Sequence, residues 1–231
     1  MNILALDTST EVLSLALLNG EKWFASDTFA GQSHSQKVLP CIRLLLEEAG
    51  LSLRDLDGIA FGEGPGSFTG LRIACGVVQG LAFGAGLPVV GVSTLKALAQ
   101  NSGADKVIAC LDARMGEVYH AAFLRQNNGW YEISSPGLFK PLQVPAIEGE
   151  NWVGIGTGWV TFQKELSEVY KANLSEIKLG ELVFNHPMAT AILQLAKPQF
   201  ESGLGKSAIT AQPVYIRNQV ALKNSERDVK S

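Results

Sequence analysis

A weak internal duplication limits most strongly what this 231-residue chain can fold into. Residues Ile3–Glu11 form an apolar stretch that ends in Asp7 and a polar turn, and an alternating strand pattern follows. Residues Val107–Glu117 repeat this order, with Asp112 in the place of Asp7. Two copies of one strand–aspartate–turn–strand unit predict two related lobes in tandem.

Hydrophobic periodicity predicts the order βββαβαβα for the first half of the chain. Strands are expected at 2–7, 11–18, 22–29, 57–61 and 88–92, and helices at 34–49, at 69–84 and from about 94. We therefore expect an α/β fold of two lobes, each a mixed sheet with helices in this order. A break at Asn101–Gly103 separates an N-terminal lobe (1–103) from a C-terminal lobe (104–231), whose last segment can pack back on the first lobe.

The glycine-rich stretch Ile59–Ala99 carries the strongest local signals. The turn at Gly62–Gly66 leaves two interpretations open, an anion cradle at a helix N-terminus or a tight turn that brings helix and strand together. The following helix has glycines at every fourth position, and each costs about 1 kcal/mol relative to alanine. Three on one face therefore indicate that another backbone approaches there; they are Gly76, Gly80 and Gly84.

A membrane span is rejected, because Pro88 and the glycines interrupt the uncharged stretch.

Composition restricts the functional classes. A hydrophobic content of 46% predicts a globular protein with a sizeable core, and a net charge of −3 provides no basic surface for RNA. The early Asp7 does not fit a secretory signal, so we expect a cytoplasmic protein. The cysteines are expected to be buried free thiols and the histidines lack metal-ligand spacing; these residues are Cys41, Cys75, Cys110, His34, His120 and His186.

Several motifs together are specific enough to indicate a family. They are LALDTST, GPGSFTGLRI, PVVGVSTL, DARMGEVY, GTGW and PVYIRN, spread over residues 2–218. They resemble the TsaB (YeaZ) family, bacterial proteins that take part in making threonylcarbamoyladenosine on tRNA. The resemblance implies an actin-like (ribonuclease H-like, ASKHA) fold, which is shared with sugar kinases and heat-shock ATPases.

The resemblance also bears on catalysis. In the catalytic relatives of this family, the TsaD proteins, a His-x-x-x-His pair places two metal ligands one turn apart on a helix. The corresponding positions here are Thr94 and Leu98, which cannot bind a metal in that way. We therefore expect no family-type metal, no other cofactor and no catalytic residue in this chain.

The function implied by the resemblance is that of a non-catalytic scaffold and activator in the modification of tRNA adenosine 37 to N6-threonylcarbamoyladenosine. The expected partners are TsaD in a heterodimer and the ATPase TsaE, with ATP, on that heterodimer. Alone, the chain is expected to form a homodimer, and tRNA is contacted only through the complex, without a membrane. The alternatives are an ATPase with the actin-like fold and a glycoprotease-type peptidase.

Two sets of candidate site residues follow. The first contains the loops that hold nucleotide in actin-like ATPases, which here are either vestigial nucleotide loops or structural turns: Asp7, Thr8, Ser9, Asp112, Gly156 and Gly158. The second is a partner surface on the helices 34–49 and 69–84, whose alternative role is to cover the sheet: Val38, Ile42, Leu45, Leu46, Gly76, Gly80 and Gly84.

Overall fold

The computed structural model describes residues 1–127, 129–179 and 185–217, so Asn218 of the last sequence motif lies outside it. Its first sheet has the strand order β3-β2-β1-β4-β5. The strands β1, β2 and β3 are antiparallel neighbours, whereas β4 runs parallel to β1 and β5 runs parallel to β4. Their bounds are β1 Asn2–Asp7, β2 Val12–Asn19, β3 Lys22–Phe29, β4 Gly58–Gly64 and β5 Val89–Ser93.

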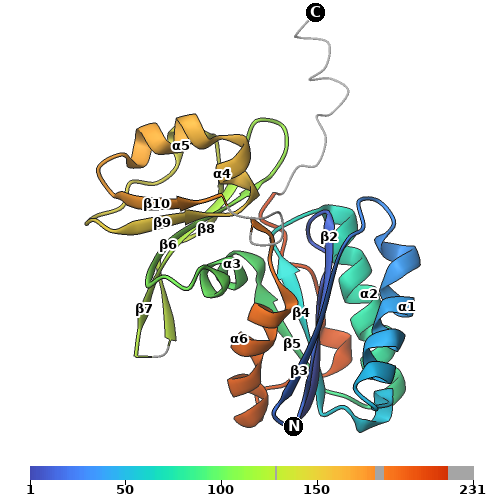
Figure 1. Cartoon of the computed structure of the whole chain (residues 1–231). Helices are drawn as coiled ribbons and strands as arrows, with labels where there is room; N and C mark the ends of the chain where they lie inside the picture. The colour runs from blue at the N-terminus through green and yellow to red at the C-terminus, as the bar shows by residue number, and fades with distance from the viewer. Residues whose placement is uncertain (128, 180–184, 218–231) are drawn as a thin grey trace, which may run out of the picture.

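Helices cover both faces of this sheet (Figure 1). On one face lie α1 (His34–Glu48) and α2 (Phe68–Ala85), and on the other lies α6 (Ala189–Glu201). Within β1 the side chains alternate accordingly, since Leu4 packs towards α1 and α2 and Ala5 towards α6. Because both faces are buried, the strand is apolar from Ile3 to Leu6.

The ends of α2 follow from its sequence. The hydroxyl of Ser67 accepts a hydrogen bond from the backbone N–H of Gly70 and so caps the N-terminus. Gly86, with φ of 69°, ends the helix in the left-handed conformation. By length and hydropathy α2 is also apolar enough to cross a membrane; here one of its faces packs against β4 and α1.

The second sheet has the order β10-β9-β6-β7-β8, which repeats the order and the strand directions of the first sheet. This repetition is the structural counterpart of the sequence duplication, and the expected two-lobed α/β fold is confirmed. The bounds are β6 Lys106–Asp112, β7 Val118–Gln126, β8 Gly129–Phe139, β9 Trp152–Ile155 and β10 Leu174–Lys178.

The second half differs from the predicted element order at two places. Where the first half has α1, the second half has only the 3-10 turn η2 (Pro141–Gln143) between β8 and β9. The single helix predicted at 159–171 is divided into α4 (Thr157–Thr161) and α5 (Gln163–Tyr170). The division lies at Phe162, whose φ of −122° and ψ of 35° depart from helical values.

The two lobes share helices across their boundary. The helix α3 (Thr94–Ser102) follows the strands of the first sheet and contacts β4 and β5 of that sheet as well as β6, β7 and β9 of the second. Conversely, α6 follows the strands of the second sheet and packs against β1, β2, β4 and β5 of the first. The two helices also contact each other, so the lobes are joined through packed helices as well as through the chain.

Candidate functional site

A cleft of about 1340 Å³ separates the two lobes. Its walls include the two duplicated turns, the N-terminal ends of α1 and α2, the helix α4 and the late segment Val214–Arg217. Each of the loops predicted from the sequence contributes to these walls, but of the six predicted residues only Ser9 and Asp112 line the cleft. The hydrogen bonds that their side chains make within the chain decide which groups are left to bind a ligand.

In the first turn, the expected phosphate-contacting groups are bonded within the protein. The hydroxyl of Thr8 donates to the carbonyl oxygen of Gly70 at 2.7 Å, and the backbone N–H of Ser67 donates to the carbonyl of Ser9 at 2.7 Å. Asp7 Oδ1 accepts from both the backbone N–H and the hydroxyl of Ser9, at 2.9 and 2.8 Å. The turn is thus bonded to itself and to the glycine-rich loop before α2.

Asp7 is fully buried at the carboxyl end of β1. Burial raises the pKa of its carboxyl to about 7, although the two hydrogen bonds from Ser9 act in the opposite direction. Among the described residues, Oδ2 has no hydrogen-bond partner, and it lies where a side chain at Gly62 would stand. Gly62 therefore has a packing role here, because any larger residue would collide with this carboxylate.

The second turn has a different arrangement. The backbone N–H of Asp112 donates to the hydroxyl of Thr157 at 3.0 Å, and Asp112 Oδ1 accepts from the backbone N–H of Arg114 at 2.7 Å. Three consecutive residues, Arg114, Met115 and Gly116, have φ values of 62°, 58° and 73°. Two of them carry side chains in the left-handed region, which glycine adopts far more readily.

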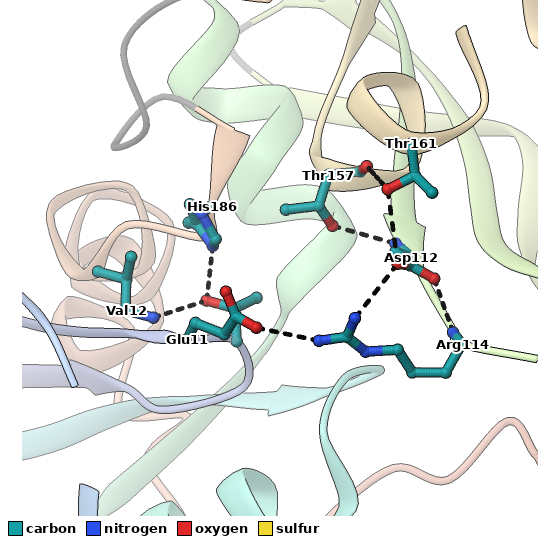
Figure 2. A network of polar contacts seen from close by, with 8 residues as sticks. Glu11, Val12, Asp112, Arg114, Thr157, Thr161 and His186 are labelled. Atoms are coloured by element: carbon teal, nitrogen blue, oxygen red, sulfur yellow. Dashed lines mark hydrogen bonds and ion pairs between the residues drawn. The ribbon is translucent and has the colours of Figure 1, made fainter. Parts of the chain in front are cut away.

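Arg114 connects the two turns across the cleft (Figure 2). Its guanidinium lies 3.0 Å from Glu11 Oε1 in the first turn and 3.7 Å from Asp112 Oδ2 in the second. The arginine side chain is 73% exposed, so this ion pair contributes at most about 1 kcal/mol. The guanidinium of Arg114 thus stands between the two turns.

Gly156 and Gly158, at the start of α4, allow this helix to pack closely against β6. Gly158 lies so close to Cys110 that an added Cβ would stand 2.8 Å from the cysteine Cβ. Gly156 has φ of 111° and lies against the carbonyl of Cys110. Both glycines permit the close approach of the backbone at Cys110. A structural turn and a ligand site both require such an approach, so the glycines do not distinguish between them.

One contact in the cleft was missed by the sequence analysis. His186 Nδ1 lies 2.8 Å from Thr10 Oγ1, although 176 positions separate the two residues. Burial lowers the pKa of His186, and Glu11 nearby partly opposes this shift. The pair links the segment before α6 to the first turn. No local sequence signal could have found it, because the contact depends on how α6 returns to the first sheet.

The structure places the predicted partner residues on opposite sides of their helices. Val38, Ile42, Leu45 and Leu46 are buried between α1 and the first sheet and belong to the core. Their apolar periodicity was correctly recognised, but it marks the face that covers the sheet rather than an exposed surface. These four residues therefore cannot form the partner surface of the folded chain.

The glycines of α2 have the opposite placement. Gly76, Gly80 and Gly84 are exposed, and an added Cβ at each would meet no atom within 4 Å. Nothing in the described part of the chain explains their small size. Large apolar side chains lie exposed on the same two helices, namely Phe83 at 83%, Leu44 at 58% and Leu39 at 50%. In the sequence, these apolar residues lie outside the periodic apolar face of each helix, and this position could have indicated the exposed surface.

The positions of the histidine pair in catalytic relatives are part of the core. Thr94 and Leu98 are both fully buried, and the hydroxyl of Thr94 donates to the carbonyl of Pro65. Within the described ranges, no group of three or more His, Cys, Asp and Glu side chains is arranged to hold a metal ion. Cys75 and Cys110 are buried free thiols as expected, whereas Cys41 is only half-buried.

The duplicated sheets, the exchanged helices and the cleft between the lobes define a protein of the actin-like class. Residues 27–150 match the family model described as TsaD, tRNA N6-adenosine threonylcarbamoyltransferase. The chain is 40% identical to the tRNA threonylcarbamoyladenosine biosynthesis protein TsaB of Escherichia coli (strain K12), with 96% of this chain and 97% of the relative covered. The chain therefore belongs to the TsaB family.

Two further comparisons agree with this assignment. TsaB of Haemophilus influenzae is 39% identical, with 96% of each chain covered. The solved structure of YeaZ from Pseudomonas aeruginosa superposes with a TM-score of 0.81 at 39% identity, covering 93% of this chain and 99% of that one. The family resemblance inferred from the sequence motifs is thus confirmed.

Proposed function

We propose that this chain is a scaffold and activator subunit in the biosynthesis of N6-threonylcarbamoyladenosine at adenosine 37 of tRNA, and that it has no catalytic site of its own. Its partners would be a TsaD protein, which carries the catalytic centre, and the ATPase TsaE bound with ATP to the heterodimer. Alone, the chain would form a homodimer. Transfer RNA would be contacted through the assembled complex, in the cytoplasm.

The observation that carries this proposal is the exposed face of α1 and α2. Three glycines leave open space along α2, and the apolar side chains of Phe83 on α2 and Leu44 on α1 are exposed. Glycines in an exposed helix lower its stability, so their presence without any intramolecular contact favours the close approach of another backbone. A related chain with two similar helices could pack here as a four-helix contact.

The two turns of the cleft support the non-catalytic part of the proposal. The groups that would hold phosphate in an ATPase are engaged within the chain, and Arg114 bridges the two turns. We therefore interpret Asp7, Thr8, Ser9, Asp112, Gly156 and Gly158 as structural turns retained from an actin-like ancestor. This interpretation predicts that the free chain does not bind ATP with magnesium in isothermal titration calorimetry.

Phe83→Asp provides a direct test of the proposed surface. Phe83 is 83% exposed, so the substitution should leave the free energy of unfolding unchanged within about 0.5 kcal/mol. A charge within the proposed apolar contact should weaken binding to the TsaD partner by tenfold or more. Size-exclusion chromatography and calorimetry with purified TsaD measure the change. Lys164→Asp, on an exposed position of α5, is the control and should bind as the wild type.

The ATPase alternative makes the opposite prediction. If the cleft binds nucleotide, titration with ATP and magnesium should give a saturable signal that Asp7→Ala abolishes. The peptidase alternative requires a hydroxyl or thiol activated by a base, and the pair nearest to this description is Thr10 with His186. Proteolysis of casein by the wild type that is lost in His186→Gln would favour that alternative.

A further inference from the structure

The segment Val214–Arg217 contacts both lobes along one wall of the cleft. It follows the 3-10 turn η4 (Ala208–Thr210), which packs on α2 of the first lobe. From there the chain reaches the second duplicated turn, in the other lobe. Four consecutive residues thus span the space between the lobes, and their contacts divide into two groups.

The first two residues are attached to the first lobe. The backbone N–H of Val214 donates to the carbonyl of Glu63 in β4 at 2.7 Å. The hydroxyl of Tyr215 accepts from Arg72 Nε at 3.0 Å, and its ring lies 5.3 Å from that of Phe68 at the start of α2. One backbone bond and two side-chain contacts therefore fix this end.

The next two residues are attached to the second lobe. Ile216 packs against the core cluster beneath β6 and β7. Arg217 lies 2.6 Å from Glu117 Oε2 and donates to the carbonyl of Ala113 at 3.1 Å. Its side chain is only 14% exposed, in contrast to Arg114 at 73%. The pair with Glu117 is therefore shielded from solvent far more than an ordinary surface ion pair.

Arg217 also contacts the strained part of the second turn. Its guanidinium reaches the carbonyl of Arg114 at 3.5 Å and the sulfur of Met115 at 3.2 Å. These are the two residues with side chains in the left-handed region, a conformation that persists only where surrounding contacts hold it. A bound guanidinium with several acceptors in the turn supplies such contacts.

We propose that Val214–Arg217 is a clasp that sets the opening of the cleft, and that Arg217 is the positioning residue of this clasp. By holding the carbonyls of the second turn, Arg217 keeps the turn in its left-handed conformation. The side chain of Arg114 then points to Glu11 on the opposite lobe (Figure 2). The clasp acts within the chain, so it does not depend on which partner binds α1 and α2.

The interlobe distance tests this proposal in Arg217→Ala. Spin labels on Glu48→Cys in α1 and Glu168→Cys in α5, both at exposed positions, report the separation of the lobes by double electron–electron resonance. Cys41→Ser removes the one native thiol that is not buried. We expect a longer mean distance and a broader distribution than in the labelled wild type. An unchanged distribution would overturn the clasp.

Trypsin provides a second readout at the turn itself, since it cleaves after Arg114. Release of the turn should accelerate this cleavage about tenfold, because proteolysis proceeds through local opening. Cleavage after Arg125, an arginine of β7 outside the clasp, is the internal control and should not change.

Glu117→Gln is the milder variant if Arg217→Ala does not fold. It removes the ion pair and leaves the bonds of Arg217 to the turn carbonyls, so both readouts should move less and in the same direction. A wild-type distance distribution together with a wild-type cleavage rate after Arg114 in Glu117→Gln would contradict the proposal.

Discussion

At the scale of single residues, Asp7 has the clearest electrostatic consequence. Its pKa of about 7 in the folded chain lies above the ordinary value of 3.8. A carboxyl with a raised folded pKa stabilises the fold fully below its unfolded pKa, and this contribution is lost as the pH rises through the folded pKa. Between pH 5 and 8 the loss from Asp7 amounts to roughly 2–3 kcal/mol.

The variant Asp7→Asn should remove this dependence. Relative to the wild type, its free energy of unfolding in urea should increase by about 2–3 kcal/mol between pH 5 and 8, because the variant keeps the stability that the wild type loses. The comparison between the two proteins is needed because burial lowers the pKa of His120 to about 4, which gives an opposite pH trend in both. Asp105→Asn, at an exposed position, should follow the wild-type profile. Parallel profiles for Asp7→Asn and the wild type would show that Asp7 does not titrate in this range.

Residue roles were only partly predictable from the sequence. The motif around Asp7 identified the turn correctly, yet it could not reveal that the hydroxyl of Thr8 donates to the carbonyl of Gly70, since this partner lies 62 positions away. The pair of Thr10 and His186 is more distant still. Both contacts depend on long-range packing, which local pattern does not contain.

At the scale of secondary-structure elements, α2 combines a buried face and an open face. Gly80→Ala should stabilise the isolated chain by about 0.5–1 kcal/mol, because alanine is the better helix former and its Cβ meets no neighbour. The same methyl group should obstruct a partner backbone and weaken pairing with TsaD. Thermal unfolding and calorimetric titration measure the two effects.

An increase in stability together with weaker pairing is expected for a glycine at an interface, whereas a glycine needed for internal packing would lose stability on substitution. Lys164→Ala, on the exposed surface of α5, serves as the control for pairing. If Gly80→Ala lowers the stability of the isolated chain, the glycine has an internal role and the proposed surface loses its main support. Unchanged affinity together with increased stability would equally count against a close backbone approach.

The elements of the first half were predictable because their signals are local. The predicted strands at 2–7, 11–18 and 22–29 lie within one residue of β1, β2 and β3, and the predicted helix at 69–84 lies within one residue of α2 at each end. Periodicity also identified the apolar face of α1 correctly. It could not show whether this face packs on the sheet of the same chain or on a partner. The absence of a helix before β9 was not anticipated, since Pro141–Gln143 replaces it without a clear pattern.

At the scale of the whole molecule, the duplication explains two sheets with the same strand order. The return of α6 to the first sheet agrees with the expectation that the last segment can pack back on the first lobe, whereas the contacts of α3 with the second sheet were not predicted. The packing of these two helices and the contacts of Arg114 and Arg217 connect the lobes around a cleft whose loop groups are engaged within the chain. These contacts support the proposal that the chain presents a surface to a partner and does not turn over a nucleotide.

The central claim, that this chain activates a catalytic partner without catalysing the reaction itself, is tested most directly by reconstitution. Purified TsaD and TsaE, ATP, unmodified tRNA and the enzyme that supplies the threonylcarbamoyl adenylate are combined with or without this chain, and the modified adenosine is measured by mass spectrometry. We predict that modification requires the chain, is lost with Phe83→Asp and is retained with Lys164→Asp. Equal modification when the chain is omitted would contradict the account.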